Sequence, residues 1–165
     1  MTDTLTAELR PLEYIPCNET LRYWREFLNR GETENVLWEL AGTDVYEYYE
    51  RQAADTRTRR FGFYVNSELI GMARISFRVN HEANGKIGYS IRPSKRGKLY
   101  APTLLRLVEE YCLLNGVKPV TACVDVRNEA SIKAFRKAGF VETGRVFDWT
   151  PNPLPRKAVE LILPY

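Results

Sequence analysis

The stretch IRPSKRGKLYAPTLL, residues 91–105, decides the fold, because it joins a strand-like segment to a helical one through a short basic turn. The apolar run KIGYSI, residues 86–91, leads into it. Four cations then fall within residues 92–98, where Gly97 is the single glycine. By its own residues this turn is open to three interpretations. It is a backbone cradle for a phosphorylated ligand, a basic patch for nucleic acid, or a charged loop that only starts a helix.

The composition is that of an ordinary globular chain, with 165 residues of which 44% are hydrophobic and 27% charged. This length predicts one domain over residues 1–165. The 24 basic and 21 acidic residues leave a net charge of +3, too even a balance to argue for a dedicated nucleic-acid-binding protein.

Cysteine usage and the N-terminus predict a cytoplasmic protein. Cys17, Cys112 and Cys123 are an odd number in unrelated contexts, which indicates free thiols in a reducing compartment. The N-terminal residues 1–11 lack the apolar core of a signal peptide, and no apolar run approaches the ~20 residues of a membrane span. We therefore expect no membrane partner.

Apolar periodicity and turn residues predict alternating helices and strands along the whole chain. The expected strands are 7–12, 59–65, 69–79, 86–92, 118–126, 140–149 and 157–164, and the expected helices are 19–29, 45–54, 99–114 and 129–137. Helices enter between some strands and not others, which is typical of a mixed sheet covered on both faces. The fold class is therefore α+β, and residues 85–126 form one right-handed strand–helix–strand crossover.

Capping residues mark several helix ends. Asn18 and Asn128 are predicted N-caps, and Asp44 with Glu47 has the spacing of a capping box. Gly139 has the position of a residue that ends a helix.

The turn before residue 99 has the physical properties of an anion site. The first turn of a helix leaves about four backbone N–H groups unpaired and carries partial positive charge. Gly97 allows a sharp turn, and small Ala101 lets a ligand approach the first helical turn. The dinucleotide-binding and P-loop motifs are both absent from the sequence, so neither of those ligand classes has motif support.

A second motif, NEASIKAFRKAGF at residues 128–140, gives the turn its context. Together the two segments resemble the GNAT superfamily of acetyl-CoA-dependent N-acetyltransferases. The family's pyrophosphate loop, Arg/Gln-x-x-Gly-x-Gly/Ala, falls on residues 96–101. Its later signature, Asn-x-x-Ser/Ala-Ile-x-x-Tyr-x-Lys-x-Gly-Phe, is matched by Asn128, Ser131, Ile132, Lys137, Gly139 and Phe140. The resemblance implies a largely antiparallel mixed sheet of six to seven strands with helices on both faces.

The resemblance also implies the cofactor-binding residues. The loop N–H groups would hold the diphosphate of acetyl-CoA, the strand end would pair with pantetheine, and the later helix would contact the pantetheine arm. These residues are Tyr89, Ser90, Ile91, Arg96, Gly97, Lys98, Leu99, Tyr100, Ala101, Asn128, Ser131 and Phe135. A backbone N–H at Ile91 would polarise the thioester oxygen, as an oxyanion hole does. No metal is expected.

Three residues depart from the family pattern. Leu99 stands where glycine is preferred, so we expect its φ to be negative, as at an ordinary helix start. Phe135 replaces a tyrosine that protonates the departing thiolate in many members, and phenylalanine has no proton to donate. Cys123 stands where some members have a glutamate base. The usual proton-transfer positions are therefore both altered.

Other side chains are candidates for the proton transfers. Ser131 lies on the same helix face as Phe135, and some branches that acetylate ribosomal-protein N-termini use a serine or water there. Asp125 could relay the proton of the amine through water, although it also fits a structural carboxylate. The single histidine, His81, falls in a predicted turn and is expected to be a bystander.

The acceptor is an unidentified amine at this stage. Tyr46, Tyr48 and Tyr49 with two glutamates could form an aromatic, acidic wall for a cationic amine, or they could be the core edge of an amphipathic helix. We expect a monomer or homodimer and no nucleic acid. Two other hypotheses stay open: a CoA-binding regulator or catalytically degenerate relative, and a nucleic-acid-binding module that uses Lys95, Arg96 and Lys98.

Overall fold

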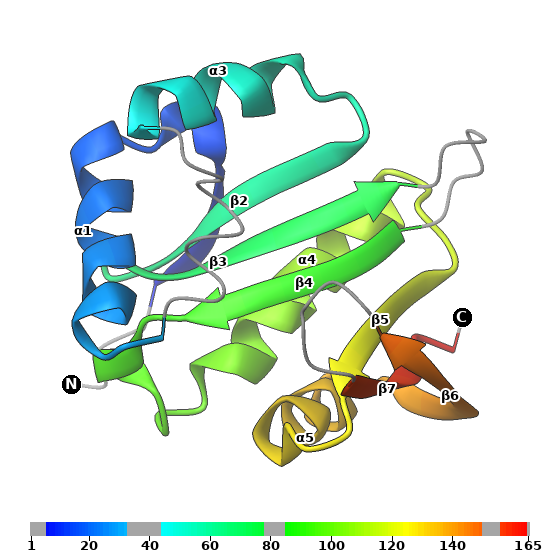
Figure 1. Ribbon diagram of the computed structural model, residues 1–165. Helices are drawn as coiled ribbons and strands as arrows, with labels where there is room; N and C mark the ends of the chain where they lie inside the picture. The colour runs from blue at the N-terminus through cyan, green and yellow to red at the C-terminus, as the bar shows by residue number, and fades with distance from the viewer. Residues whose placement is uncertain (1–5, 33–43, 78–84, 150–155, 165) are drawn as a thin grey trace, which may run out of the picture. The chain divides into compact units, whose positions relative to one another are not determined.

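The computed structural model describes residues 6–32, 44–77, 85–149 and 156–164. Its seven strands form one sheet with the order β1-β2-β3-β4-β5-β7-β6 (Figure 1). The strands are β1 (Ala7–Pro11), β2 (Thr58–Val65), β3 (Glu68–Phe77), β4 (Gly85–Ile91), β5 (Val120–Asp125), β6 (Val141–Trp149) and β7 (Arg156–Ile162). The helices of the described residues are α1 (Cys17–Asn29), α3 (Val45–Ala54), α4 (Tyr100–Leu114) and α5 (Glu129–Lys137). The predicted α+β class and element order are confirmed.

The sheet is mostly antiparallel, as the resemblance implied. β1 pairs antiparallel with β2, and β7 pairs antiparallel with both β5 and β6. β4 and β5 pair in parallel, from Gly85 with Val120 and Lys86 with Thr121. Because α4 connects these two parallel strands, the predicted strand–helix–strand unit is confirmed.

The chain divides into two compact units, one of residues 1–74 with 89–100 and the other of residues 75–88 with 101–165. The single domain over residues 1–165 stays a prediction.

The first unit has an aromatic core in which α1 and α3 take part. Tyr23, Trp24 and Phe27 recur on one face of α1 and are each at most 4% exposed. The rings of Trp24 and Tyr48 meet edge to face, with centroids 4.7 Å apart. Such aromatic pairs add about 0.5–1.5 kcal/mol beyond the area they bury. The packing of this face therefore stabilises α1 more than its caps do.

The start of α1 differs from the prediction, because Asn18 is not its N-cap. The helix begins at Cys17 and Pro16 is the capping residue, which makes no side-chain cap hydrogen bond. Proline fits this place because its fixed φ and missing N–H cost nothing where helical N–H groups are unpaired anyway. Asn18 therefore lies inside the first turn.

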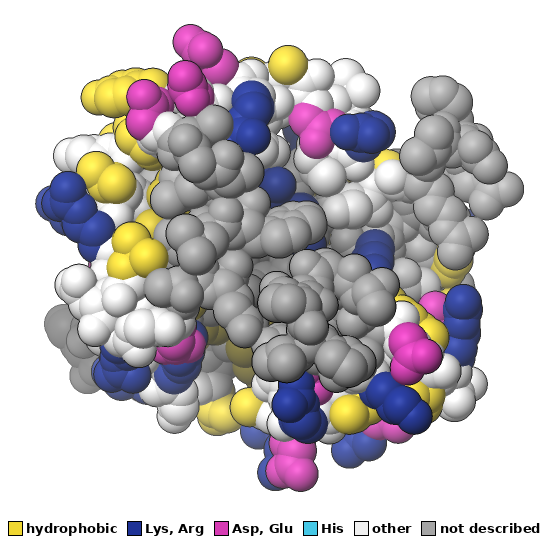
Figure 2. All heavy atoms as spheres, in the orientation of Figure 1, with side chains coloured by type: hydrophobic (Ala, Val, Ile, Leu, Met, Phe, Trp, Pro, Cys, Tyr) yellow, Lys and Arg dark blue, Asp and Glu magenta, His cyan; other side chains and the backbone are white. Residues whose placement is uncertain are grey.

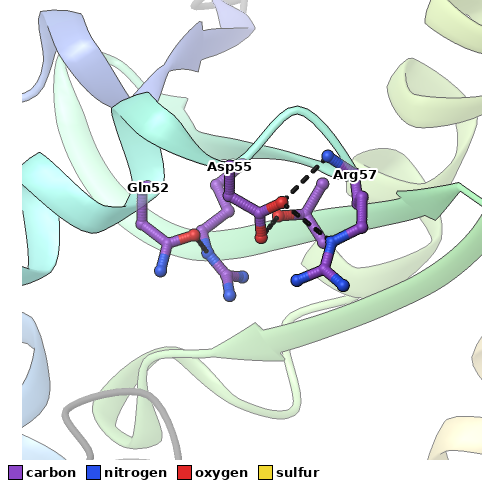
Figure 3. Close-up of polar contacts among 5 residues, drawn as sticks. Gln52, Asp55 and Arg57 are labelled. Atoms are coloured by element: carbon purple, nitrogen blue, oxygen red, sulfur yellow. Dashed lines mark hydrogen bonds and ion pairs between the residues drawn. The ribbon is translucent and has the colours of Figure 1, made fainter.

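Both ends of α3 are held by aspartates. The Asp44 Oδ1 accepts a hydrogen bond from the backbone N–H of Glu47 at 2.8 Å, so this predicted cap is confirmed. After the helix, the Asp55 carboxylate accepts from the backbone N–H of Arg57 and from the Thr58 hydroxyl, both at 2.9 Å (Figure 3). These donors, the Arg57 N–H first, lower the pKa of Asp55. Together they join α3 to β2 through a tight turn.

The second unit packs α4 and α5 with strands β5 to β7. Asn128 caps α5 as predicted, since its Oδ1 accepts from the backbone N–H of Ser131 at 3.2 Å. Gly139 has a φ of +98° just after that helix, which is the left-handed conformation expected of a helix stop. The rings of Phe135 and Phe140 then pack edge to face at 5.0 Å. Residues 128–140 thus form a capped helix whose C-terminal end is held by the packing of Phe135 against Phe140.

Candidate functional site

The basic turn lies between the end of β4 and the start of α4, as predicted. A short 3₁₀ helix occupies Pro93–Lys95, and α4 begins at Tyr100. The backbone N–H of Arg92 donates to the carbonyl of Ile70 at 2.7 Å, and that of Ser94 donates to the Glu26 carboxylate. The turn is therefore anchored on its β4 side, and residues 96–99 connect that anchor to the helix.

Leu99 has a φ of +61°, so the prediction that it starts the helix with a negative φ is wrong. Two residues before it, Gly97 has a φ of +77°. The chain therefore turns through the left-handed region twice before α4 begins. That conformation brings the Cβ of an L-residue close to a carbonyl oxygen and costs about 1–2 kcal/mol. The Leu99 side chain is 66% exposed, so packing offsets little of this cost. Leu99 thus adopts the backbone form for which the family prefers glycine.

This backbone geometry suits an anion. The sign of φ alternates over residues 97–99, and such alternation can turn successive N–H groups toward one side. The first-turn N–H groups of α4, which have no acceptor within the helix, follow directly. Pro102 lies in that turn, where its lack of an N–H costs no helical hydrogen bond. A Cβ built on Gly97 meets no heavy atom within 4 Å, so the surface there is open. The loop therefore has a backbone conformation compatible with anion binding, and its role toward CoA stays a prediction.

Most of the cations of the turn are paired with carboxylates of the first unit. The pairs are Arg92 with Glu26 at 3.1 Å and with Glu68 at 3.5 Å, Lys95 with Glu68 at 3.3 Å, and Arg96 with Glu32 at 2.8 Å. Lys98 is exposed and has no ion-pair partner among the described residues. Cationic and anionic side chains also intermingle on the face drawn in Figure 2. Arg92, Lys95 and Arg96 are thus already neutralised by carboxylates, so the turn is not a free basic patch.

The end of β4 holds the three predicted residues Tyr89, Ser90 and Ile91. The Ser90 hydroxyl shares a hydrogen bond of 2.7 Å with the hydroxyl of Tyr23 on α1. Burial raises the pKa of Tyr23, so this phenol stays protonated. The Ile91 side chain is 8% exposed, and Tyr89 is half-buried. The side chains of Ser90 and Ile91 therefore fasten the strand, and any contact with pantetheine falls to its backbone.

In the second unit, Asn128 and Ser131 lie at the start of α5, where Asn128 is exposed and Ser131 half-buried. Phe135, one turn further, is 2% exposed. Asp125 accepts hydrogen bonds from Arg127 on both carboxylate oxygens, from the backbone N–H at 2.9 Å and from the guanidinium at 3.0 and 3.2 Å. Asp125 thus shapes the turn from β5 into α5, and its catalytic role stays a prediction.

Sequence reasoning missed one carboxylate near the altered base position. Glu160 on β7 is the cross-strand neighbour of Cys123 on β5. The two residues are 37 positions apart in the sequence, so only strand pairing brings them together. The apolar segment VELIL at residues 159–163 was the available signal, since Glu160 is one acidic residue among apolar neighbours.

The tyrosines of α3, which could have formed an aromatic wall or a core edge, are largely core. Tyr48 is 1% exposed, and the Tyr49 hydroxyl donates to the carbonyl of Ile15 at 2.7 Å. Only Tyr46, at 69% exposure, points into solvent among these three tyrosines. The amphipathic-helix interpretation of this segment is therefore the one the structure supports. His81 and the TPNPLP segment at residues 150–155 lie outside the described residues.

Within the described ranges, no helix combines the length and the apolar character that crossing a membrane requires. Over the same part of the chain, no three His, Cys, Asp or Glu side chains gather as metal ligands would.

Comparisons with known proteins find solved structures of the same fold. The chain resembles a spermidine N-acetyltransferase from Vibrio cholerae solved with CoA and spermine, at 18% identity and a TM-score of 0.72, over 95% of each chain. A chimera of the spermidine N-acetyltransferase SpeG from Vibrio cholerae and hSSAT gives 21% identity and a TM-score of 0.73, over 95% of this chain and 94% of that one. RimJ from Mycobacterium smegmatis, solved with CoA-disulfide, gives 17% identity and a TM-score of 0.75, over 94% of this chain and 80% of that one.

These similarities show the fold. A comparison with curated proteins finds no match. The sequence model of the acetyltransferase (GNAT) domain matches residues 9–141, which is well over half of the 165 residues. The chain belongs to the GNAT acetyltransferase family.

Proposed function

We propose that the protein is an N-acetyltransferase that moves an acetyl group from acetyl-CoA directly to a primary amine of a small molecule or peptide. The observation that carries this proposal is the turn at residues 96–101. Two left-handed residues, Gly97 and Leu99, precede the unpaired N–H groups of α4, and the surface over Gly97 is open. Family membership supplies the reaction class, and the structural relatives solved with CoA support the cosubstrate.

Different residues bind different parts of acetyl-CoA in this proposal. Backbone N–H groups of residues 97–101 hold the diphosphate, and Lys98 adds positive charge at the surface. The Arg96 N–H, which the sequence predicted as a further donor, instead donates to the Pro93 carbonyl at 3.4 Å. The backbone of Tyr89, Ser90 and Ile91 pairs with the pantetheine. Asn128, Ser131 and Phe135 of α5 line the pantetheine arm. The Ile91 N–H polarises the thioester carbonyl.

The transfer needs no covalent acyl-enzyme. The acceptor ammonium first loses a proton, its nitrogen attacks the thioester carbon, and the C–S bond breaks as the C–N bond forms. The departing thiolate then takes a proton. Its conjugate thiol has a pKa near 8–9, so Ser131 or a water molecule is an adequate donor. Because the oxygens of Asp125 accept bonds from Arg127, Asp125 is proposed only as a relay through water.

Acetyl-CoA binding is tested by thermal shift at increasing ligand concentration. Wild-type protein should be stabilised, and Ala101→Glu should abolish the shift because a carboxylate there repels the diphosphate. Ala101→Ser is the matched control, since it adds one polar atom without charge, and it should keep the shift. Gly97→Trp should also abolish binding. A flat melting temperature up to millimolar acetyl-CoA would refute the proposal.

Turnover is tested by release of free thiol across a panel of amines. Ser131→Ala should lower kcat by at least about tenfold if its hydroxyl donates the proton, since general acids typically contribute 10²–10⁴-fold. Asp125→Asn separates a relay from a turn-shaping role. A relay predicts loss of kcat with an altered pH profile, whereas a turn-shaping role predicts a lower melting temperature alone.

A second candidate function is a CoA-binding regulator, which the buried Phe135 favours because that position has no proton to donate. This alternative predicts stabilisation by acetyl-CoA without thiol release on any amine. A cytoplasmic location and a monomeric or homodimeric state remain predictions. Size-exclusion chromatography with light scattering tests the oligomeric state.

A further inference from the structure

The second unit contains a hollow of about 380 Å³ that the proposed CoA contacts do not use. Its volume lies within the range of about 300–1,000 Å³ that is typical of small-molecule sites. Its lining residues are Ser76, Phe77, Gly85, Lys86, Pro119, Thr121, Cys123, Arg145, Phe147 and Glu160.

Polar side chains reach this hollow from five strands, β3 to β7. On β5 the even-numbered residues Val120, Ala122 and Val124 are buried, whereas Thr121 and Cys123 are half-buried. Glu160 of β7 lies opposite Cys123, so both side chains project from the same sheet face. Lys86 of β4 is paired with Thr121 and is on that face as well. The hollow is thus built by sheet register rather than by one loop.

Glu160 is the single carboxylate of the lining. Its side chain is 22% exposed. Its Oε1 accepts a hydrogen bond from the Thr143 hydroxyl at 3.2 Å, and its Oε2 lies 3.6 Å from Nη1 of Arg145. These contacts hold the carboxylate in place and leave it next to the open volume. A primary ammonium, with three N–H donors, is a suitable partner for such an oriented carboxylate.

Two cations flank this carboxylate. Lys86 is exposed, and Arg145 is 66% exposed with its guanidinium 5.4 Å from the ring centroid of Phe147. A guanidinium has five N–H donors, and the ion pair with Glu160 engages one nitrogen of Arg145. Against one carboxylate, the two cations leave a charge of +1. The hollow is therefore matched to a molecule with both an amine and an acidic group, and mismatched to a polycation.

We propose that this hollow binds the acetyl acceptor, and that the acceptor is a small amine that also carries a carboxylate, as an α-amino acid does. Glu160 receives the ammonium, while Arg145 and Lys86 receive the carboxylate. Glu160 Oε2 and Arg145 Nη1 are 3.6 Å apart, so the ammonium and the carboxylate that they bind must also lie close together, as they do in an α-amino acid. This inference rests on the proposed acetyltransferase function. It separates this chain from the spermidine N-acetyltransferases that share its fold.

The test uses the twenty proteinogenic α-amino acids, the decarboxylated amine of each, and spermidine. Binding in the presence of CoA is measured by calorimetry, and turnover by thiol release. We expect at least one amino acid to be acetylated with a kcat/KM at least tenfold above that of its decarboxylated amine and of spermidine. Arg145→Gln should reduce this preference about tenfold through a higher KM, since a charge-assisted hydrogen bond is lost. Lys86→Gln should act in the same direction.

Arg136→Gln is the matched control, because Arg136 is an exposed cation of the same unit that pairs with Glu142 outside the hollow. It should leave the preference unchanged. Glu160→Gln should weaken the binding of amino acids and of plain amines to the same extent. Melting temperatures of all variants show whether they fold.

The possible outcomes are distinguishable. Acetylation of spermidine or plain amines in preference to every amino acid would overturn the inference and leave the proposed function standing. An equal change of the preference in Arg145→Gln and Arg136→Gln would do the same. If no amine is acetylated but an amino acid binds with Arg145-dependent affinity, the proposed function fails and the acceptor role of the hollow fails with it, while the hollow is shown to be an amino-acid site. Absence of both binding and turnover overturns the inference.

Discussion

Replacing Leu99 by glycine tests whether the strain in the turn is real. Leu99 has a φ of +61° and a side chain that is 66% exposed. At an ordinary φ, glycine is less stable than alanine by roughly 0.5–1 kcal/mol, because the unfolded chain gains freedom. At a left-handed residue, the Cβ costs about 1–2 kcal/mol, which glycine avoids. The difference between these two effects favours glycine by roughly 0.5–1 kcal/mol.

The comparison that isolates this strain is Leu99→Gly against Leu99→Ala. Both variants lose the same atoms beyond Cβ, so the side-chain contacts of leucine cancel. We expect Leu99→Gly to be the more stable of the two by roughly 0.5–1 kcal/mol, or about 1–4 °C in melting temperature for a chain of this size. Urea denaturation with an unchanged m value is the assay.

Gly97→Ala is the reverse perturbation in the same turn. The φ of Gly97 is +77°, and a built Cβ meets no heavy atom within 4 Å. The cost of alanine there is therefore conformational, about 1 kcal/mol.

The result that would refute the Leu99 prediction is Leu99→Ala at least as stable as Leu99→Gly. Residue 99 would then not be left-handed, and the proposed anion-binding turn would lose its main support.

Three further changes have defined outcomes. Burial raises the pKa of Glu109 on α4 to about 7, and its Oε1 has no hydrogen-bond partner among the described residues. Because the folded state favours the protonated carboxyl, the free energy of unfolding should fall as the pH rises from about 4.5 to about 7. Glu109→Gln should remove that fall and raise the free energy of unfolding by about 1 kcal/mol at pH 8, a value reduced to allow for partial exposure. Urea denaturation at pH 5 and pH 8 measures it, and an equal gain at both pH values would contradict the prediction. Asn128→Ala should cost about 1 kcal/mol by loss of the α5 cap, whereas Asn128→Asp should cost little, as measured by thermal denaturation. Asp55→Ala should lower stability at pH 7 by about 1 kcal/mol. That cost should shrink as the pH falls below the ordinary pKa of 3.8, because the lowered pKa stabilises the folded state only while the carboxyl is ionised; a constant difference in an acid titration would count against it.

Local signals predicted the elements of this chain well. The caps Asp44 and Asn128 and the helix stop at Gly139 lie where the sequence placed them, because a cap depends on residues within one helical turn. Asn18 was the exception. Pro16 starts α1 earlier than a side-chain cap at Asn18 would, since a proline fits the helix entrance without a capping hydrogen bond.

The sequence predicted where the basic turn lies, between β4 and α4, but not the interactions that hold it. The ion pairs of Arg92 and Arg96 run to Glu26 and Glu32, more than sixty positions away in the sequence. The conformation of Leu99 was also missed, because a rule based on steric preference cannot weigh the strain of one residue against the anchoring of its neighbours.

The sequence by itself determined the family, the order of helices and strands, and the position of the basic turn between β4 and α4. These features depend on periodicity and on short motifs, which are local along the chain. Tertiary structure alone decided which cations of the turn are neutralised, that Leu99 is left-handed, and that Glu160 stands beside Cys123. Such features depend on strand register and packing between distant segments, and a register shift of one residue would send the Glu160 side chain to the opposite face of the sheet.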